Sequence, residues 1–408
     1  MTQQIMQPII QPNLASPQFK ANPFPFFARL RAEAPVYRAQ LSRRESVWLV
    51  ARYDDVLAVL KDERFGKDRF KAMTQEQQAK MPWMPGMIKP LTQNMLDLDA
   101  PDHTRLRGLV HKAFTPRLIE QLRGRVHTLC DELLDAVLRR GHMDLVRDYA
   151  LPLPVTIIAE MLGIPPKDRT KFTRWSNSIV SVGSSSEVLR ALPSIWLFMR
   201  YLRKRFEERR AAPQDDLITA LVQAEEAGDR LSEDELLAMV LLLLIAGHET
   251  TVNLIANGTL ALLEHREQME RLRGEPELIK PAIEELLRYT SPVYTSTERF
   301  AREDLTLCGV MIRRGEQVLA VIASANRDEQ HFERPDALDL ARDPNRHLSF
   351  GQGIHYCLGA PLARLESQIA VDMLLRRMPD LRLATAPDAL RWRRGLVLRG
   401  LHALPVAF

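Results

Sequence analysis

Cys357 lies in a sequence that suits a metal-binding thiolate. The preceding loop contains Gly351 and Gly353, and an Ala-, Leu- and Arg-rich stretch typical of a helix begins directly after the cysteine. A cysteine at the start of a helix is favoured as the thiolate by the helix dipole and by free backbone N–H groups. Glycines let the loop adopt unusual angles and approach a flat ligand. The alternative is an inert, buried cysteine that packs like a small apolar residue, the role that we expect for Cys130 and Cys308.

A second group of chemically capable residues interrupts a long apolar segment. Residues 232–265 have a helical pattern that opens with the capping box of Ser232 and Glu235. Residues 236–245 are apolar on all sides, which predicts a helix that runs through the core. The sequence AGHETT at residues 246–251 then breaks this pattern. Glycine and polar groups inside a buried helix reduce stability, so such a break usually marks a functional site.

This break supports a role in proton transfer. Thr250 can bond the carbonyl of Ala246, four residues earlier, which would bend the helix and open a groove. Small Ala246 and Gly247 leave room for a small molecule. Glu249 and Thr250 could then relay protons as general acids. A helix kink with a polar patch is the alternative interpretation, and His248 is not expected to be a ligand.

These two segments resemble the motifs of the cytochrome P450 family. Phe-x-x-Gly-x-x-x-Cys-x-Gly, the family's haem-binding motif, is matched by the residues Phe350, Gly351, Gly353, Cys357 and Gly359. The stretch at residues 246–251 resembles the oxygen-binding motif (Ala/Gly)-Gly-x-(Asp/Glu)-Thr. The resemblance implies a haem b whose iron is bound by the Cys357 thiolate, a ligand that favours O–O cleavage. The acid–alcohol pair favours O2 over peroxide as oxidant. A peroxide-using enzyme and a haem-thiolate sensor without turnover stay open.

Glu285 and Arg288 form a pattern that carries little information by itself. Pairs three residues apart on an exposed helix face are common and contribute little. Their position, about 70 residues before Cys357, is where the P450 family has a buried Glu–Arg–Arg cluster. The resemblance implies that Arg342 is the third member, with Leu338 in place of the usual Phe. We expect these residues to stabilise the proximal side of the fold, so that losing one is severe.

Haem also brings two propionates, which need cationic or hydrogen-bonding partners. His103 and Arg107 lie four residues apart, on one face of a predicted helix. The resemblance implies propionate contacts from both, from Arg299 and from His355, and further haem contacts from Phe350, Gly351, Ala246 and Gly359. Each cation could instead be an ordinary surface residue.

Substrate and partner contacts are predicted only by analogy with the family. Substrate walls are expected from residues 81–95, 175–195, Leu243, Ala246, 293–295 and Val397. The Met-rich loop at residues 81–88 suits a bulky apolar substrate, and a loop that packs on the core is the alternative interpretation. Electrons are expected from a separate ferredoxin or flavodoxin-type protein with its NAD(P)H reductase. Candidate docking cations are Arg105, Lys112, Arg117 and Arg364.

The elements that must hold these residues are mostly helices. Helical patterns are predicted at residues 24–33, 55–61, 104–113, 116–140, 152–162, 167–182, 187–209, 214–226, 232–265, 276–289 and 358–377. Strands are predicted at residues 47–50, 293–300, 305–313, 317–322 and 396–403. We therefore expect a mainly α, P450-like fold: one domain over residues 21–408 with a smaller β-rich portion, preceded by a loose arm over residues 1–20.

The bulk properties agree with a soluble cytoplasmic enzyme. Among 408 residues, 56 Lys and Arg against 52 Asp and Glu give a net charge of only +4, which does not suggest nucleic-acid binding. Three widely spaced cysteines form no disulfide framework and no zinc pattern. We see no signal peptide, and the longest apolar run is far shorter than the ~20 residues of a membrane span.

Overall fold

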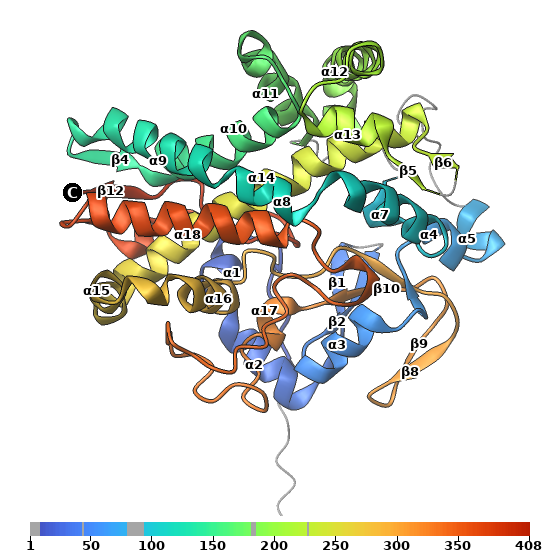
Figure 1. Ribbon diagram of the computed structural model, residues 1–408. Helices are drawn as coiled ribbons and strands as arrows, with labels where there is room; N and C mark the ends of the chain where they lie inside the picture. The colour runs from blue at the N-terminus through green and yellow to red at the C-terminus, as the bar shows by residue number, and fades with distance from the viewer. Residues whose placement is uncertain (1–8, 43–44, 80–93, 181–184, 227) are drawn as a thin grey trace, which may run out of the picture.

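The computed structural model describes residues 9–42, 45–79, 94–180, 185–226 and 228–408. Helices build the larger part of the molecule, and most of the strands lie in one region beside them, while a few short strands lie elsewhere (Figure 1). The helices are α1 Pro17–Ala21, α2 Phe24–Glu33, α3 Tyr53–Lys61, α4 Arg69–Ala72, α5 Gln75–Ala79, α7 Asp102–Ala113, α8 Pro116–Gln121, α9 Arg123–Leu138, α10 Pro152–Met161, α11 Pro166–Val180, α12 Ser185–Ala211, α13 Leu217–Gln223, α14 Glu233–Glu264, α15 Arg266–Gly274, α16 Ile279–Thr290, α17 Ile322–Ala325 and α18 Ala360–Arg377. The mainly α prediction is therefore confirmed.

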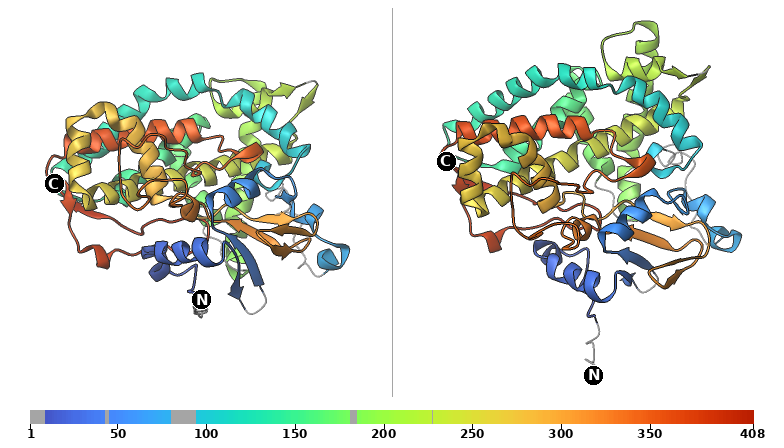
Figure 2. Two further views of the ribbon diagram at one scale, coloured as in Figure 1. Left: turned by 90° about the horizontal axis from the view of Figure 1, so that it is seen from below. Right: turned by 60° about the horizontal axis from the view of Figure 1, so that its bottom comes forward.

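Strands form one larger sheet and several small ones. The strands are β1 Val36–Ser42, β2 Glu45–Val50, β3 Phe65–Gly66, β4 His142–Asp144, β5 Glu225–Glu226, β6 Asp229–Arg230, β7 Arg299–Ala301, β8 Leu305–Leu307, β9 Val310–Ile312, β10 Gln317–Ala320, β11 Arg382–Leu383 and β12 Pro405–Ala407. The order in the larger sheet is β1-β2-β10-β7-β3, with β10 parallel to β2 and the other pairs antiparallel. Figure 2 shows this sheet, with the β8–β9 hairpin, beside the helical part.

Helix α14 is the central element of the helical part. It begins at the predicted capping box, in which the side chains of Ser232 and Glu235 each bond the other residue's backbone N–H. It then packs against α10, α16 and α18. By length and composition this helix could also cross a membrane, but 61% of its apolar window is buried inside the protein. The apolar run therefore serves as a core helix, as the sequence predicts.

The structure corrects several predicted boundaries, including that of the strand expected over residues 293–300, which begins only at Arg299. The helix expected over residues 116–140 is divided into α8 and α9 at Leu122. The strand expected over residues 396–403 contains only isolated bridges, because its backbone bonds go to several different segments. The prediction of a loose arm over residues 1–20 is wrong for the later part of this range, because Leu14 and Phe19 are buried and α1 begins at Pro17.

Candidate functional site

The loop before α18 holds Cys357 on the wall of an internal cavity. The Cys357 N–H donates to the Phe350 carbonyl at 2.9 Å. Gly353 has φ +74°, and a Cβ there would lie 2.9 Å from the carbonyl oxygen of Leu60, at the end of α3. Gly351 also has a positive φ of 70°. A larger residue at either position would be strained, so the glycines are required for the loop to fit against α3 and present the sulfur to the cavity.

The groups around the Cys357 sulfur have opposing effects on the pKa of its thiol. Burial raises the pKa of the Cys357 thiol, while the backbone N–H groups of Gly359 and Ala360 and the guanidinium groups of Arg107 and Arg364 lower it. The predicted N–H groups at the start of α18 are therefore present. A bound metal cation would favour the thiolate further, since a coordinating thiol loses its proton.

The residues of the α14 break face this cavity from the opposite helix. Ala246, Gly247, Thr250 and Thr251 line the cavity. The Thr250 hydroxyl donates to the Ala246 carbonyl at 2.9 Å, which confirms the predicted bond. His248 is buried, and its Nδ1 lies 2.6 Å from the Leu244 carbonyl, so this ring is satisfied within the helix, as expected for a residue that is not a ligand.

Glu249 departs from the expected acid–alcohol pair. It is not among the cavity-lining residues, and its carboxylate lies 3.3 Å from the Arg393 guanidinium. The Glu249 side chain is directed toward Arg393, whereas its neighbours Thr250 and Thr251 line the cavity. The structure therefore brings Thr250, and not Glu249, to the cavity.

The cavity wall between Cys357 and Thr250 is mainly apolar. Its apolar lining includes Met95, Leu96, Phe114, Ile158, Leu242, Leu243, Leu254, Val293 and Ile322. Of the expected substrate walls, Met95, Leu243, Ala246 and Val293 lie here. Val397 does not, since it lines a separate cavity beside the N-terminal segment. The Met-rich loop at residues 81–88 lies outside the described residues.

Five nitrogen-bearing side chains line one part of the same cavity. His103 and Arg107 come from α7, Arg299 from β7, His355 from the cysteine loop, and Lys67 from the segment after β3. The rings of His103 and His355 lie 4.2 Å apart. Both ring nitrogens of His103, Nε2 of His355 and Nε of Arg299 are buried without a hydrogen-bond partner among the described residues. Sequence reasoning missed Lys67, a lone lysine outside any motif.

The protonated forms of these side chains repel one another, and burial disfavours each of them further. Burial lowers the pKa of His103 to about 4, with a further contribution from Arg107. Burial, helped by His103 and Arg299, lowers the pKa of His355 to about 2. Burial also lowers the pKa of Lys67 to about 8. Anionic oxygens would satisfy the orphaned nitrogens and relieve this repulsion, so the residues fit the two carboxylates of a haem.

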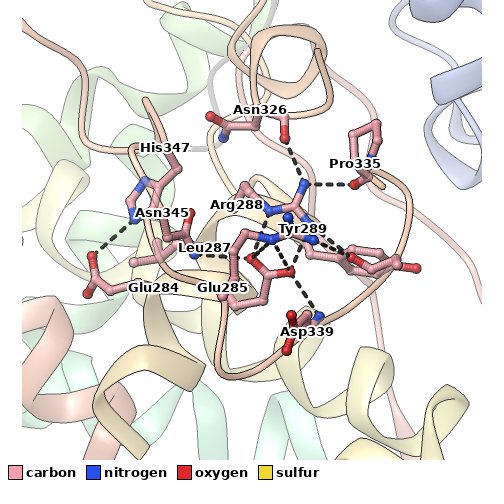
Figure 3. Close-up of polar contacts among 12 residues, drawn as sticks. Glu284, Glu285, Leu287, Arg288, Tyr289, Asn326, Pro335, Asp339, Asn345 and His347 are labelled. Carbon is pink, nitrogen blue, oxygen red and sulfur yellow. Dashed lines mark hydrogen bonds and ion pairs between the residues drawn. The ribbon is translucent and has the colours of Figure 1, made fainter. Parts of the chain in front are cut away.

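The predicted Glu–Arg–Arg cluster is present and buried. Glu285 and Arg288 are completely buried on α16, and their side chains are joined by two hydrogen bonds of 2.7 and 2.8 Å (Figure 3). Arg342 donates to both oxygens of Glu285 at 3.1 Å, and Asn345 adds a bond of 3.0 Å. Arg288 also binds the carbonyls of Asn326, Pro335 and Ala337. The prediction of a structural cluster is confirmed.

Two of the predicted docking cations are paired with acids within the chain. Arg105 bonds Asp229 and Glu235. Arg364 binds Glu284 through two hydrogen bonds of 2.7 and 2.8 Å. The other two candidates, Lys112 on α7 and Arg117 on α8, are exposed.

Known proteins match this chain along almost its whole length. A family model described as cytochrome P450 matches residues 6–379. The polyketide biosynthesis cytochrome P450 PksS of Bacillus subtilis is 48% identical over 393 residues, 96% of each chain. Its solved structure superposes with a TM-score of 0.91 and covers 97% of this chain and 99% of that one, at 46% identity.

Two further relatives carry names that state an activity. The cytochrome P450 monooxygenase PikC of Streptomyces venezuelae is 44% identical over 402 residues, which cover 98% of this chain and 94% of PikC. The mycinamicin IV hydroxylase/epoxidase of Micromonospora griseorubida is 43% identical over 386 residues, 94% of each chain.

Proposed function

Because this chain belongs to the cytochrome P450 family, we propose that it inserts one oxygen atom from O2 into a bulky apolar small molecule, by hydroxylation or epoxidation. The observation that carries the proposal is one apolar cavity with Cys357 on one wall and Ala246 and Thr250 on another. The relatives named for polyketide biosynthesis and for mycinamicin IV oxidation support a substrate of secondary metabolism.

The cofactor of this family is a haem iron, which we propose to be haem b here. When bound, the haem supplies oxygen activation and transfer, helped by its thiolate ligand. Cys357 would bind the iron, and Phe350, Gly351 and Gly359 would surround the sulfur side of the ring. His103, Arg107, Arg299 and His355, with Lys67, would hold the propionates.

Thr250 and Glu249 would then act in sequence in proton delivery. Of these two residues, only Thr250 lines the cavity, where its hydroxyl can hold a proton at Oγ1. Glu249 would leave the Arg393 guanidinium, take up a proton from solvent and pass it toward Thr250. Because the two side chains lie at different places on α14, they support a two-step proton relay and not a joint contact with the cavity.

The remaining proposals concern partners and location. We infer a separate ferredoxin or flavodoxin-type donor with its NAD(P)H reductase, in the cytoplasm. The exposed cations Lys112 and Arg117 are candidates for docking it.

The carbon monoxide complex of the reduced protein tests the proposal. A thiolate-ligated haem should give the strongly red-shifted Soret band. Cys357→Ser should lose this band, whereas Cys308→Ser, at an exposed cysteine, should keep it. An unshifted wild-type band would contradict the iron ligand. The peroxide-using alternative would be favoured if product forms with hydrogen peroxide alone and not with O2 and an electron donor. The sensor alternative would be favoured if a broad panel of apolar ligands changes the spin state of the iron but none of them is converted to product.

A further inference from the structure

A second cavity lies away from the cysteine site. It has a volume of about 490 Å³ and is bounded by α2, the end of α14, α16 and the chain that follows β11. No residue that lines it also lines the cavity at Cys357. A volume of this size is typical of pockets for small organic ligands.

The walls of this cavity combine guanidinium groups with aromatic rings. Arg399 lies over the ring of Trp392, with 3.8 Å to the ring centroid, and 5.6 Å from that of Phe24. Arg327 lies between Phe24 and Tyr289, at 3.7 and 4.1 Å. Stacking fixes the flat faces of both groups against rings. Their N–H donors then point along the plane of each guanidinium, where a planar acceptor can meet them.

Arg399 brings a buried positive charge without a matching anion. Only 7% of this residue is exposed. Its Nε and Nη2 donate to the backbone carbonyls of Lys20 and Ala21 at 2.9 and 3.3 Å. No carboxylate of the described residues forms an ion pair with it, whereas Arg327 is paired with Asp336 at 2.7 Å. Burial, with a further contribution from Arg327, lowers the pKa of Arg399 to about 10, although Glu264 in the same cavity acts in the opposite direction without forming an ion pair.

Two unsatisfied polar atoms belong to the same walls. Nε of Arg327 and Oδ1 of Asn257 are buried without a hydrogen-bond partner among the described residues. The amide nitrogen of Asn257 already donates to the Arg399 carbonyl at 2.8 Å. Buried groups of this kind are normally bonded, so the Arg327 Nε–H has capacity for an acceptor atom of a ligand, whereas Oδ1 of Asn257 needs a donor that a carboxylate does not supply. A second wall, with Leu260, is apolar.

We propose that this cavity binds a planar aromatic carboxylate, with the carboxylate on Arg399 and the ring against Trp392 and Leu260. The carboxylate neutralises the buried charge and accepts in-plane hydrogen bonds. Glu264 and Asp336 also line the cavity. They would repel a doubly charged phosphate more strongly than a singly charged carboxylate. The proposal concerns a different cavity from that of the proposed oxidation and does not rest on it.

Ala28 offers a clean test, because it lines the cavity from an exposed position on α2. Arg399 itself is unsuitable, since its bonds to Lys20 and Ala21 hold the N-terminal segment. Ala28→Glu adds a competing carboxylate, and Ala28→Gln adds the same bulk without charge. The holoprotein would be titrated with 2-naphthoate by calorimetry while the Soret spectrum is recorded.

We expect 2-naphthoate to bind the wild-type holoprotein with no change in the Soret band. Ala28→Gln should change the affinity by less than about threefold, and Ala28→Glu should weaken it by roughly tenfold or more, because two like charges meet in a partly buried site. The neutral alcohol 2-naphthalenemethanol should bind at least about tenfold more weakly than the carboxylate.

Several results would overturn this inference. Absence of binding would remove the site, and equal losses in the two Ala28 variants would remove the role of charge. A Soret shift on binding, insensitive to Ala28→Glu, would locate the ligand in the cavity at Cys357. Displacement by equimolar sulfate would show that the cavity takes inorganic anions and not aromatic carboxylates.

Discussion

Thr250 and Glu249 are neighbours in the sequence, but their side chains have different surroundings. The Thr250 hydroxyl lies at the cavity and bonds the Ala246 carbonyl, while Glu249 is held by Arg393. A motif that names two adjacent residues therefore describes two separate positions on α14. At the scale of single residues, the proposed chemistry depends on which of them can reach the cavity.

Thr250→Ala should uncouple oxygen consumption from product. It removes the proton-holding hydroxyl at the cavity, so product formed per electron pair should fall roughly tenfold or more. Thr259→Ala is the matched control, because Thr259 makes the same type of bond, to the Ile255 carbonyl at 2.8 Å on the same helix, but does not line the cavity. Oxygen uptake and product would be measured together. Unchanged coupling in Thr250→Ala would remove this residue from proton delivery.

Glu284 gives a prediction about pH. Burial alone would raise the pKa of Glu284, but hydrogen bonds from Arg364 and His347 outweigh burial and lower the pKa to about 2. Because this lies below the unfolded value of about 4.5, the stabilisation is complete above pH 4.5 and is lost as the pH falls toward 2.

Glu284→Gln should therefore destabilise the fold at pH 7 by up to about 3 kcal/mol. The difference from wild type should shrink below pH 4.5 in denaturant unfolding measured from pH 7 to 3. Glu277→Gln, at an exposed site, should cost less than about 0.5 kcal/mol at every pH. A Glu284→Gln penalty that stays constant across this range would show that the carboxylate's charge is not the cause.

At the scale of elements, the Glu285 cluster joins α16 to the segment that precedes the cysteine loop. Glu285→Gln should cost about 3–5 kcal/mol, because it leaves two buried guanidinium groups without their anion. Glu270→Gln on α15 removes a similar i,i+3 pair with Arg273, but an exposed one, and should cost less than about 1 kcal/mol. Unfolding free energies would be compared by denaturant titration; equal costs would contradict the assigned role of burial.

The sequence predicted elements best where a local signal marked them. The capping box at Ser232 and the helical pattern after it led to α14, and the motif around Cys357 led to the cysteine loop. The division between α8 and α9 at Leu122 has no proline to mark it, and Gly124 lies inside the first turn of α9 instead of between the helices.

Contacts between distant segments could not be predicted in this way. Lys67 enters the cavity only because β3 pairs with β7, which also carries Arg299. The direction of Glu249 depends on Arg393, 144 residues later in the chain. Tertiary pairing of this kind leaves no periodicity in the sequence near either residue.

At the scale of the whole molecule, the N-terminal segment is part of the core. The Phe19 ring contacts Phe26, Phe27 and Tyr294 edge-on, at centroid distances of 5.5, 5.9 and 6.4 Å. Lys20 beside it bonds the Leu398 carbonyl. Figure 2 shows the N-terminal helices beside the strand-rich part.

Phe19→Ala should lower the free energy of unfolding by about 3 kcal/mol, through lost apolar burial and a cavity among the rings. Ile10→Ala, at a residue that is 83% exposed, should change it by less than about 0.5 kcal/mol. Guanidinium unfolding followed by circular dichroism would measure both. A negligible effect of Phe19→Ala would mean that the segment before α2 does not belong to the cooperative core.

The bond between Lys20 and Leu398 joins residues 378 positions apart. A ribosome adds about 5–20 residues per second, so roughly 20–75 s pass between the synthesis of the two partners. During that time Leu14 and Phe19 have left the ribosome without the C-terminal segment and Tyr294 that later cover them. Leu14 and Phe19 are therefore translated long before the partners that complete their burial, and we expect the nascent chain to expose them during this time.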